Sequence, residues 1–372
     1  MSNMNEIIII GGNHHNTLGV IRALGEKGLS ATLIVVSKDK KPFVSCSKYL
    51  KRVIQIASDD QIPITLLSAC KSDNGQPVVI CCTDASAGVV DENMDSLTPF
   101  FLLPGADTQG RISSLMSKKS MASLAVEVGL SIPQTCYADV LDNPDAIPLP
   151  CIIKPLVSRM GTKAHIKTCH STEEVRQWIL HVGANQVQIQ QFIDKDFEYQ
   201  LIGCSTDNDV IIPGVSKILR PCKGSNTSFL HYEPLSKDFC DLQKCKDFVR
   251  KTGYKGLFSL EFLRDKHGND YFMEINFRND GNAICVTAAG MNLPYIWCLF
   301  RMGKNYLEEA SRQIAPVYVM PDLAELKLLL TGQISPAAYL GDLRKTNRFM
   351  EYDKNDTRPF WRMIRAKLKL SW

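Results

Sequence analysis

The segment DYFMEINFRNDGN (270–282) carries hydrophilic groups at every second position between large apolar residues. Glu274, Asn276 and Arg278 should therefore share one face of a strand, because successive side chains of a strand point to opposite sides. A carboxylate, an amide and a guanidinium in one row make this face a candidate functional surface. The other face is predicted to point into the core and carries Tyr271, Met273, Ile275 and Phe277.

The preceding segment GLFSLEFLRD (256–265) completes a predicted β-hairpin around a tight turn. A symmetric turn sets Glu261 directly opposite Glu274, and two like charges in that position destabilise a sheet. Mg²⁺ is typically held by one or two carboxylates and substrate phosphates, so Glu261, Glu274 and Asn276 form a candidate metal site. Arg278 could then bind a phosphate oxygen. The alternative is a solvated polar face on which Arg278 neutralises one glutamate.

A lysine lies near the end of the apolar strand predicted over CIIKPL (151–156). Burying the charged side chain of Lys154 at that position costs free energy unless the charge is paired with a carboxylate or binds a ligand. The loop that follows carries Gly161, Thr162 and Lys163, and its backbone N–H groups could approach a phosphate. A phosphate-binding strand and loop is one interpretation, and a lysine that reaches the edge of a sheet is the other.

Parallel-sheet elements precede these candidate sites. A run of four isoleucines (7–10), a glycine turn, a helix over 17–28 and a strand over 31–37 predict a right-handed βαβ unit. Further parallel strands are predicted over 78–83 and 100–105. The turn does not have the GxGxxG pattern, so a dinucleotide site is only weakly supported.

The central part of the chain alternates between predicted helices and strands. We expect helices over 117–129, from 171 or 172 onward, and over roughly 236–252, strands over 151–156, 164–168 and 187–193, and a hairpin over 197–218 that turns at 207–209.

The composition is that of a globular protein. The chain has 372 residues, of which 45% are hydrophobic and 22% charged, and its formal net charge of +4 is too mild to indicate nucleic-acid binding. The 13 cysteines include no CxxC pair and no zinc-finger spacing to histidine, so a zinc site is not expected. Neither a signal peptide nor a membrane span is evident, and we expect a cytoplasmic protein with reduced thiols.

In order and separation, these motifs resemble the ATP-grasp superfamily of carboxylate–amine ligases and its carbamoyl-phosphate-synthase-like relatives. The matching segments are a helix opened by a lysine and followed by a G…P-x-T turn (118–135), the IIKP strand (152–155) and VQIQQFIDKDFE (187–198). Glu261 then precedes the E-x-N-x-R motif (274–278) by the spacing typical of the family. The resemblance covers nearly the whole chain.

The resemblance implies an α/β fold in which ATP lies between two antiparallel sheets. The implied divisions are an N-terminal Rossmann-like parallel-sheet domain (1–115), a small ATP-grasp subdomain with a lid loop (116–190), a large ATP-grasp subdomain with the metal site (191–310) and a helical C-terminal extension (311–372).

The resemblance also implies roles for individual residues. The implied ATP ligands are Lys118, Lys154, Gly161, Thr162 and Lys163 at the phosphates, Gln191, Phe192 and Ile193 at the adenine, and Glu198 at the ribose. The implied ligands of one or two Mg²⁺ ions, which Mn²⁺ could replace, are Glu261, Glu274 and Asn276. The implied catalytic residues are Arg278, Asn276 and Arg220.

The sequence departs from the family pattern at several positions. Gln191 stands where an acidic hinge residue is usual, although its carbonyl can still accept a bond from the adenine amino group. Ser117 stands where an aspartate is common, and the lid loop has a single glycine. Two roles stay open: Arg220 binds a phosphate or carboxylate or is a surface arginine, and the turn 11–16 contacts the carboxylate substrate or is structural.

The implied activity is ATP-dependent formation of an amide-type C–N bond. A carboxylate attacks the γ-phosphate of ATP to give an acyl phosphate, and an amine then displaces phosphate, so that ADP and phosphate are the products. Carbamoyl phosphate or carboxyphosphate chemistry and a non-catalytic ATP-binding module are the alternatives. The implied partners are small-molecule carboxylate and amine substrates, and a homodimer is compatible with the family.

The C-terminal segment RPFWRMIRAKLKLSW (358–372) interleaves basic and apolar residues. A basic amphipathic helix of this kind could lie on an anionic membrane. The alternative, which we favour, is a terminal helix that packs on the body and exposes a basic face. The overlapping segment DTRPF (356–360) resembles the D-P-R-P ending of ATP-grasp proteins from polysaccharide and peptide-modification clusters.

Overall fold

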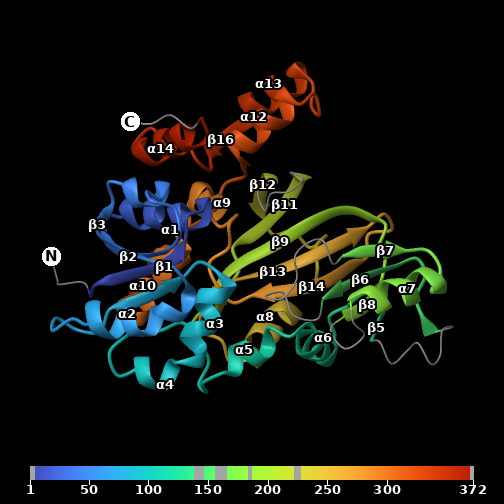
Figure 1. Cartoon of the computed structure of the whole chain (residues 1–372), viewed down its shortest axis with the longest axis horizontal. Coiled ribbons are helices and arrows are strands. Elements are labelled where there is room, and N and C mark those ends of the chain that lie inside the picture. Colours follow the sequence, from blue (N-terminus) through green and yellow to red (C-terminus); the bar gives the residue numbers. More distant parts are fainter. Residues whose placement is uncertain (1–4, 138–145, 156–165, 183–186, 222–227, 369–372) are drawn as a thin grey trace.

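The computed structural model describes residues 5–137, 146–155, 166–182, 187–221 and 228–368. In that part of the chain a parallel sheet, a small antiparallel sheet and a large mixed sheet follow one another in sequence (Figure 1). The parallel sheet and the small antiparallel sheet lie at opposite ends, with the large sheet between them (Figure 1). This is the α/β arrangement predicted from the sequence.

The N-terminal sheet has the order β3-β2-β1-β4 and is parallel throughout. The strands β1, β2 and β4 are apolar on both sides because helices cover both faces. Ile7 and Ile9 pack with α1, α9 and α10, whereas Ile8 and Ile10 pack with α2 and α3. The elements are β1 (Ile7–Gly12), α1 (His15–Gly25), β2 (Ala31–Val36), β3 (Leu50–Ile56), α2 (Ile62–Ala69), β4 (Val78–Cys81), α3 (Asp84–Glu92), α4 (Met94–Leu97) and α5 (Arg111–Leu115), with short 3₁₀ turns η1 (Phe43–Cys46) and η2 (Asp59–Gln61).

One predicted strand of this region was wrong. Residues 100–105 contribute only isolated bridges, from Leu102 to Val78 and from Gly105 to Lys255. Phe101 and Leu103 are buried in the core, so the apolar run packs there without forming a ladder. The fourth strand of the sheet is instead β3, an edge strand that is largely exposed and that the sequence pattern did not reveal.

The small sheet has the order β5-β8-β6-β7, and every pairing in it is antiparallel, as predicted. Its core is formed where Val175 and Ile179 of α7 pack with Ile153 and Ile189. The elements are α6 (Lys118–Glu127), β5 (Thr135–Tyr137), β6 (Cys151–Pro155), β7 (Lys167–Cys169), α7 (Thr172–Val182) and β8 (Val187–Gln191).

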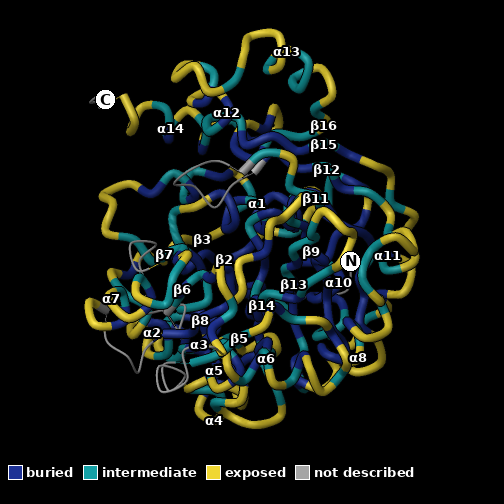
Figure 2. Tube along the Cα trace, turned by 90° about the vertical axis from the view of Figure 1, so that its right-hand side faces the viewer, coloured by how far each residue is buried: buried dark blue, intermediate teal, exposed yellow. Residues whose placement is uncertain are grey.

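The large sheet has the order β14-β13-β9-β11-β12-β15-β16, with β10 beside β9. It is antiparallel except for the parallel pair β15–β16. Its strands lie mainly in the buried interior (Figure 2). The elements are β9 (Lys195–Ser205), β10 (Val210–Ile211), β11 (Gly214–Pro221), β12 (Ser228–Pro234), α8 (Leu242–Thr252), β13 (Gly256–Asp265), β14 (Asp270–Asn276), β15 (Val317–Met320) and β16 (Thr346–Phe349).

The predicted register of the β13–β14 hairpin is confirmed at the candidate site: Glu261 pairs with Glu274. Nearer the turn the register is shifted by one residue, because a β-bulge lies between Glu261 and Phe262. Phe262 therefore pairs with Phe272 and not with Met273. The predicted core face was therefore wrong near the turn. Phe272 is the residue buried there, whereas Tyr271 and Met273 are only partly buried.

The C-terminal part contains the predicted helices, but it also adds β15 and β16 to the large sheet. Trp297 of α10 is buried and donates a hydrogen bond through Nε1 to the carbonyl of Val79 at 3.0 Å, which joins this part to the N-terminal sheet. Within the described segments, no helix is long and apolar enough to cross a membrane. The helices are α9 (Ile284–Ala289), α10 (Leu293–Arg301), α11 (Leu307–Ala310), α12 (Asp322–Leu330), α13 (Pro336–Lys345) and α14 (Arg358–Lys367).

Candidate functional site

Two paired glutamates form the centre of the candidate site. Glu261 on β13 and Glu274 on β14 are both partly exposed and lie directly opposite each other. Oε1 of Glu261 accepts hydrogen bonds from the Asn276 side chain at 3.0 Å and from the Gln200 side chain at 3.2 Å. Burial, followed by the charge of Glu274, raises the pKa of Glu261 to about 8. A proton or a cation is therefore favoured between the two carboxylates.

Two lysines from other elements, one on α6 and one on β6, lie near this pair. Lys118 is the first residue of α6, and its Nζ lies 3.7 Å from Oε2 of Glu274. Lys154 on β6 donates a hydrogen bond through Nζ to the side-chain oxygen of Gln190 at 2.9 Å. Burial, and then the charge of Lys118, lowers the pKa of Lys154 to about 8, while Glu274 opposes the change. The site thus brings together carboxylates from the large sheet with cationic groups from a helix and from the small sheet.

The residues at this centre fit a hard divalent cation. The available donors are the carboxylates of Glu261 and Glu274, and Mg²⁺ prefers such oxygen ligands. The Asn276 side chain turns its Nδ2 toward Glu261 and its Oδ1 toward Arg278 in this structure, so its predicted role as a metal ligand stays a prediction. Burial and then the charge of Glu274 raise the pKa of Glu261, and a cation bound between the two carboxylates would oppose that rise. Among the described residues, no group of three or more His, Cys, Asp and Glu side chains could hold a metal. Phosphate oxygens and water would therefore have to complete the coordination of an ion.

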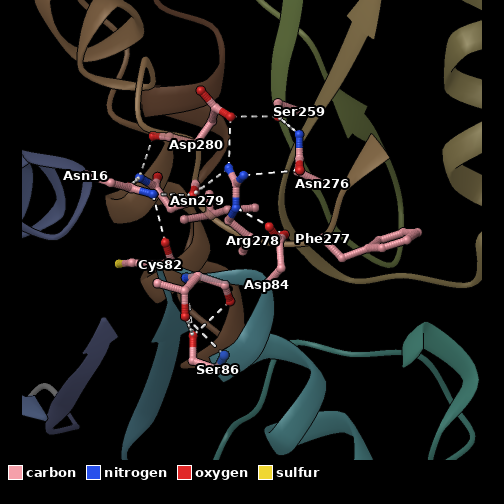
Figure 3. Close-up of polar contacts among 12 residues, drawn as sticks. Asn16, Cys82, Asp84, Ser86, Ser259, Asn276, Phe277, Arg278, Asn279 and Asp280 are labelled. Carbon is pink, nitrogen blue, oxygen red and sulfur yellow. Dashed lines mark hydrogen bonds and ion pairs between the residues drawn. The ribbon is translucent and has the colours of Figure 1, made fainter. Parts of the chain in front are cut away.

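Arg278 follows β14 and is fixed by partners from two parts of the chain (Figure 3). Its guanidinium lies 2.8 Å from Asp280 and 3.2 Å from Asp84, and it donates a hydrogen bond to Oδ1 of Asn276 at 3.1 Å. Although burial lowers it, the carboxylates of Asp84 and Asp280 raise the pKa of Arg278 above its ordinary value. Arg278 is thus a fixed, permanently charged group beside the glutamate pair.

The turn after β1 contacts the loop that follows Arg278. Asn16 donates hydrogen bonds to the carbonyls of Asn279 and Cys82, each at 2.8 Å, and Asn279 donates to the side-chain oxygen of Asn16 at 2.6 Å (Figure 3). Burial, and then the charge of Arg278, lowers the pKa of His14. The predicted substrate turn and the predicted catalytic arginine therefore lie in one neighbourhood.

The predicted adenine and ribose residues lie at the junction of β8 and β9. The N–H of Phe192 donates a hydrogen bond to the carbonyl of Pro150 at 2.9 Å, and Oε1 of Gln191 accepts one from the N–H of Gln134 at 3.4 Å. Ile193 is buried. Glu198 forms an ion pair with Lys195, and its charge contributes to the pKa of Lys154.

Arg220 is not brought to the glutamate pair. Its guanidinium forms ion pairs with Glu325 of α12 and Asp342 of α13, both at 2.7 Å, and stacks on the ring of Phe229. Its predicted catalytic role stays a prediction. The predicted phosphate-loop residues Gly161, Thr162 and Lys163 lie outside the described residues.

Sequence reasoning missed several members of this cluster. Gln200 on β9 links Glu261 to Asn282, whose side chain donates to Oε1 of Gln200 at 2.8 Å. Asp84 and Asp280 are the carboxylates that hold Arg278. Asp280 could have been found from its position two residues after Arg278, whereas no local signal in the sequence marks Gln200 or Asp84.

Comparison with curated proteins gives relatives that match part of this chain. No family model matches the sequence. Formate-dependent phosphoribosylglycinamide formyltransferase from Bacteroides fragilis is 24% identical over 198 residues, which cover 49% of this chain and 50% of that protein. The same enzyme from Flavobacterium psychrophilum is 26% identical over 188 residues, which cover 47% of this chain and 48% of that protein. The chain thus matches about half the length of these relatives.

Comparison with solved structures identifies the fold over most of the chain. L-amino acid ligase from Bacillus licheniformis superimposes with a TM-score of 0.63 at 15% identity, covering 85% of this chain and 79% of that one. The ADP complex of N5-carboxyaminoimidazole ribonucleotide synthetase superimposes with a TM-score of 0.65 at 12% identity, covering 90% of this chain and 87% of that one. A third neighbour is the biotin carboxylase domain of 2-oxoglutarate carboxylase from Hydrogenobacter thermophilus, solved with MgADP and bicarbonate. It superimposes with a TM-score of 0.63 at 14% identity, covering 82% of this chain and 71% of that one. The chain has the ATP-grasp fold predicted from its motifs.

Proposed function

We propose that this chain is an ATP-dependent ligase that forms an amide-type C–N bond from a carboxylate and an amine. The observation that carries the proposal is the convergence of the Glu261–Glu274 pair with Lys118 and Lys154, which come from two other elements. Paired carboxylates suit a metal–nucleotide complex, and the lysines suit its phosphates. The fixed guanidinium of Arg278 beside them suits a reaction in which negative charge develops.

In the proposed ground state, the two lysines neutralise the phosphates of ATP, and Glu261, Glu274 and Asn276 hold Mg²⁺. The bound ion would shield phosphate charge and make the γ-phosphorus more open to attack. The adenine edge is assigned to the backbone at Phe192–Ile193 and to the carbonyl of Gln191, and the ribose hydroxyls to Glu198. The same proposal includes one or two Mg²⁺ ions. It also assigns Gly161, Thr162 and Lys163 to the phosphates of ATP.

The proposed reaction has two bond exchanges. An oxygen of the substrate carboxylate attacks the γ-phosphorus, and the bond from that phosphorus to the β–γ bridging oxygen breaks with its electron pair on ADP. The amine nitrogen then attacks the acyl carbon, the C–O bond to phosphate breaks, and the nitrogen releases its proton to water. Arg278 stabilises the oxyanion of the tetrahedral intermediate, and Asp84 and Asp280 keep its guanidinium oriented.

The binding site of the carboxylate substrate is assigned to the turn 11–16. Its support is the set of hydrogen bonds that joins Asn16 to Asn279, next to Arg278. His14 lies close enough to Arg278 for the two charges to interact. A small carboxylate between His14 and Arg278 would be near the reacting phosphate.

Carboxyphosphate chemistry is the second candidate, and a specific observation favours testing it. One structural neighbour is a biotin carboxylase domain that was solved with bicarbonate. The curated relatives are formate-dependent. Bicarbonate, formate and larger carboxylates all present an oxygen nucleophile that can attack a γ-phosphate, so one arrangement of charges can serve each of them.

The test is a panel of acids and amines in which ADP formation is measured. Formate, bicarbonate, amino acids and uronic acids are combined pairwise with amino acids, peptides and amino sugars. Ligation predicts ADP release that needs both partners and a product with a new C–N bond by mass spectrometry. ADP release with bicarbonate alone favours carboxyphosphate chemistry. Nucleotide binding without ADP release for any pair would overturn the proposal in favour of a binding module. Small-molecule substrates and a homodimer stay predictions, the dimer being testable by sedimentation.

A further inference from the structure

A basic hollow lies between α14 and η1, away from the glutamate pair. Its volume is about 330 Å³, and it is open to solvent. In Figure 1 α14 lies over the N-terminal domain, whereas β13, β14 and β6 lie toward the other end of the molecule. We call this hollow the arginine pocket, and its lining residues are Cys46, Thr357, Arg358, Trp361, Arg362 and Arg365.

Three arginines share one face of α14 because they are four and three residues apart. In the described part of the chain, no carboxylate forms an ion pair with Arg358, Arg362 or Arg365. The nearest acid in sequence, Asp356, is already committed elsewhere, because it binds Arg22 at 3.2 Å and accepts from the Ser47 hydroxyl at 2.8 Å. No ion pair among the described residues therefore compensates the positive charge of the pocket.

The pocket contains a donor without a partner. The Nε of Arg362 is buried, and no described residue offers it a hydrogen-bond acceptor. A buried guanidinium N–H normally has an acceptor, since leaving it unsatisfied costs free energy. Beside it, the side chain of Trp361 is 53% exposed. An anion in the pocket would instead contact the outer N–H groups of the arginines, and an apolar or ring-shaped group attached to it could lie on the exposed Trp361 side chain.

The helix that carries these side chains is held in place. Pro359 and Met363 are buried, and α14 packs on η1. The loop before it is anchored by the buried pair of Arg22 and Asp356. The three guanidinium groups are thus preorganised on a rigid element, which lowers the entropic cost of binding.

We propose that the arginine pocket binds a phosphate-bearing anion. Guanidinium groups present planar pairs of N–H donors that match phosphate oxygens, and three of them on one face match a group with several negative oxygens. The phosphate could belong to a soluble metabolite or to a lipid headgroup, and the chemistry of the pocket is the same for both. The pocket is independent of the proposed ATP site.

The first test is a titration of the full-length protein with inorganic pyrophosphate, followed by tryptophan fluorescence. We expect a saturable change that the Trp361→Phe variant lacks. The titration is made with and without MgADP, so that any effect at the ATP site is identified by its loss when nucleotide is present. A failure of the proposed ligase activity would leave this result unaffected.

Variants decide whether the pocket is responsible. Arg362→Gln should weaken binding by about ten-fold, as expected for one lost charge-assisted hydrogen bond. Arg362→Lys keeps the charge but not the paired donors, and it should weaken binding as well. Arg344→Gln, at an exposed position of α13, is the matched control and should leave binding unchanged.

Vesicles distinguish the two sources of phosphate. If the ligand is a headgroup, the protein should co-sediment with phosphatidylcholine vesicles that contain phosphatidic acid, and not with phosphatidylcholine alone. If it is soluble, pyrophosphate should bind and neither vesicle should sediment the protein. The proposal is overturned if neither probe binds, or if the Arg358→Gln/Arg362→Gln/Arg365→Gln variant binds as well as the wild type. The proposal would also be overturned if the wild type binds no anion and the triple variant loses a dimer that the wild type forms, because the arginines would then serve an interface between two copies of the chain.

Discussion

Arg278 and Asp84 join two separate parts of the fold: Nε of Arg278 lies 3.2 Å from Oδ1 of Asp84, the first residue of α3 (Figure 3). Arg278 follows the hairpin of the large sheet, whereas Asp84 follows the last strand of the N-terminal sheet. The proposed catalytic arginine is thus oriented by a domain that contributes neither the glutamate pair nor the lysines. This contact assigns the N-terminal domain a positioning role.

Asp84→Asn should lower kcat by about ten-fold, a loss of about 1.4 kcal/mol of transition-state stabilisation, and leave KM for ATP nearly unchanged. The reason is that Arg278 keeps its charge but loses one of the carboxylates that orient it. Asp95→Asn, at an exposed position of α4, is the control. Steady-state kinetics with the best substrate pair measures both constants. An equal rise in KM for ATP would instead indicate a role in nucleotide binding.

Glu274→Gln should abolish ATP turnover, by at least about 100-fold, because one of the two proposed carboxylate ligands of Mg²⁺ is lost. The fold should survive, since the change removes a like-charge contact with Glu261. Glu308→Gln, at an exposed position of α11, should retain full activity. ADP release and thermal unfolding are measured together. Normal turnover in Glu274→Gln would show that the metal assignment is wrong.

Lys118→Met should raise KM for ATP by about ten-fold or more, because a charge-assisted contact to phosphate contributes about 1.5–3 kcal/mol. Its neighbour Lys119 is exposed and lies beside the ring of Tyr137, so Lys119→Met is a control of the same type one residue away. Nucleotide binding by calorimetry gives the comparison directly. Equal effects of both substitutions would point to general electrostatic attraction.

The pKa of Lys154, lowered to about 8, predicts a pH effect on ATP capture. The charged form binds phosphate, so loss of this proton should lower kcat/KM for ATP above about pH 8, whereas ionisation of Glu261, whose pKa is also raised to about 8, acts in the opposite direction. The ratio of kcat/KM in the wild type to that in Lys154→Arg isolates the lysine, and it should fall as pH rises through about 8. In the free protein the buried charge costs folding stability below pH 8, and this cost should fade between about pH 8 and the ordinary lysine value. A pH profile shared by wild type and Lys154→Arg would contradict the assignment.

Asp356→Asn should destabilise the protein by about 3–5 kcal/mol, because it leaves the buried charge of Arg22 without its partner. Asp194→Asn breaks the exposed pair with Lys266 and should cost less than about 1 kcal/mol. Urea unfolding of both variants makes the comparison. A small effect of Asp356→Asn would mean that the end of the chain contributes little to the stability of the N-terminal domain.

Features that depend on short-range periodicity could be predicted from the order of the amino acids alone. The alternation around Glu261 and Glu274 was enough to predict their face and pairing, because a strand has a fixed period of two residues. The order of the motifs was enough to predict the ATP-grasp fold, since each motif occupies a fixed place along the chain. The pattern failed at Phe272, because a single bulged residue reverses the faces nearer the turn.

The contacts between groups that are far apart in the chain became known from the folded structure. Asp84 approaches Arg278, Gln200 approaches Glu261, and Arg220 is taken up by Glu325 and Asp342 of the C-terminal helices. Such contacts join residues that are far apart in sequence, so no local pattern encodes them. They arise from the packing of whole sheets and helices, which sets the distances between side chains and thereby the charges and pKa values of the site.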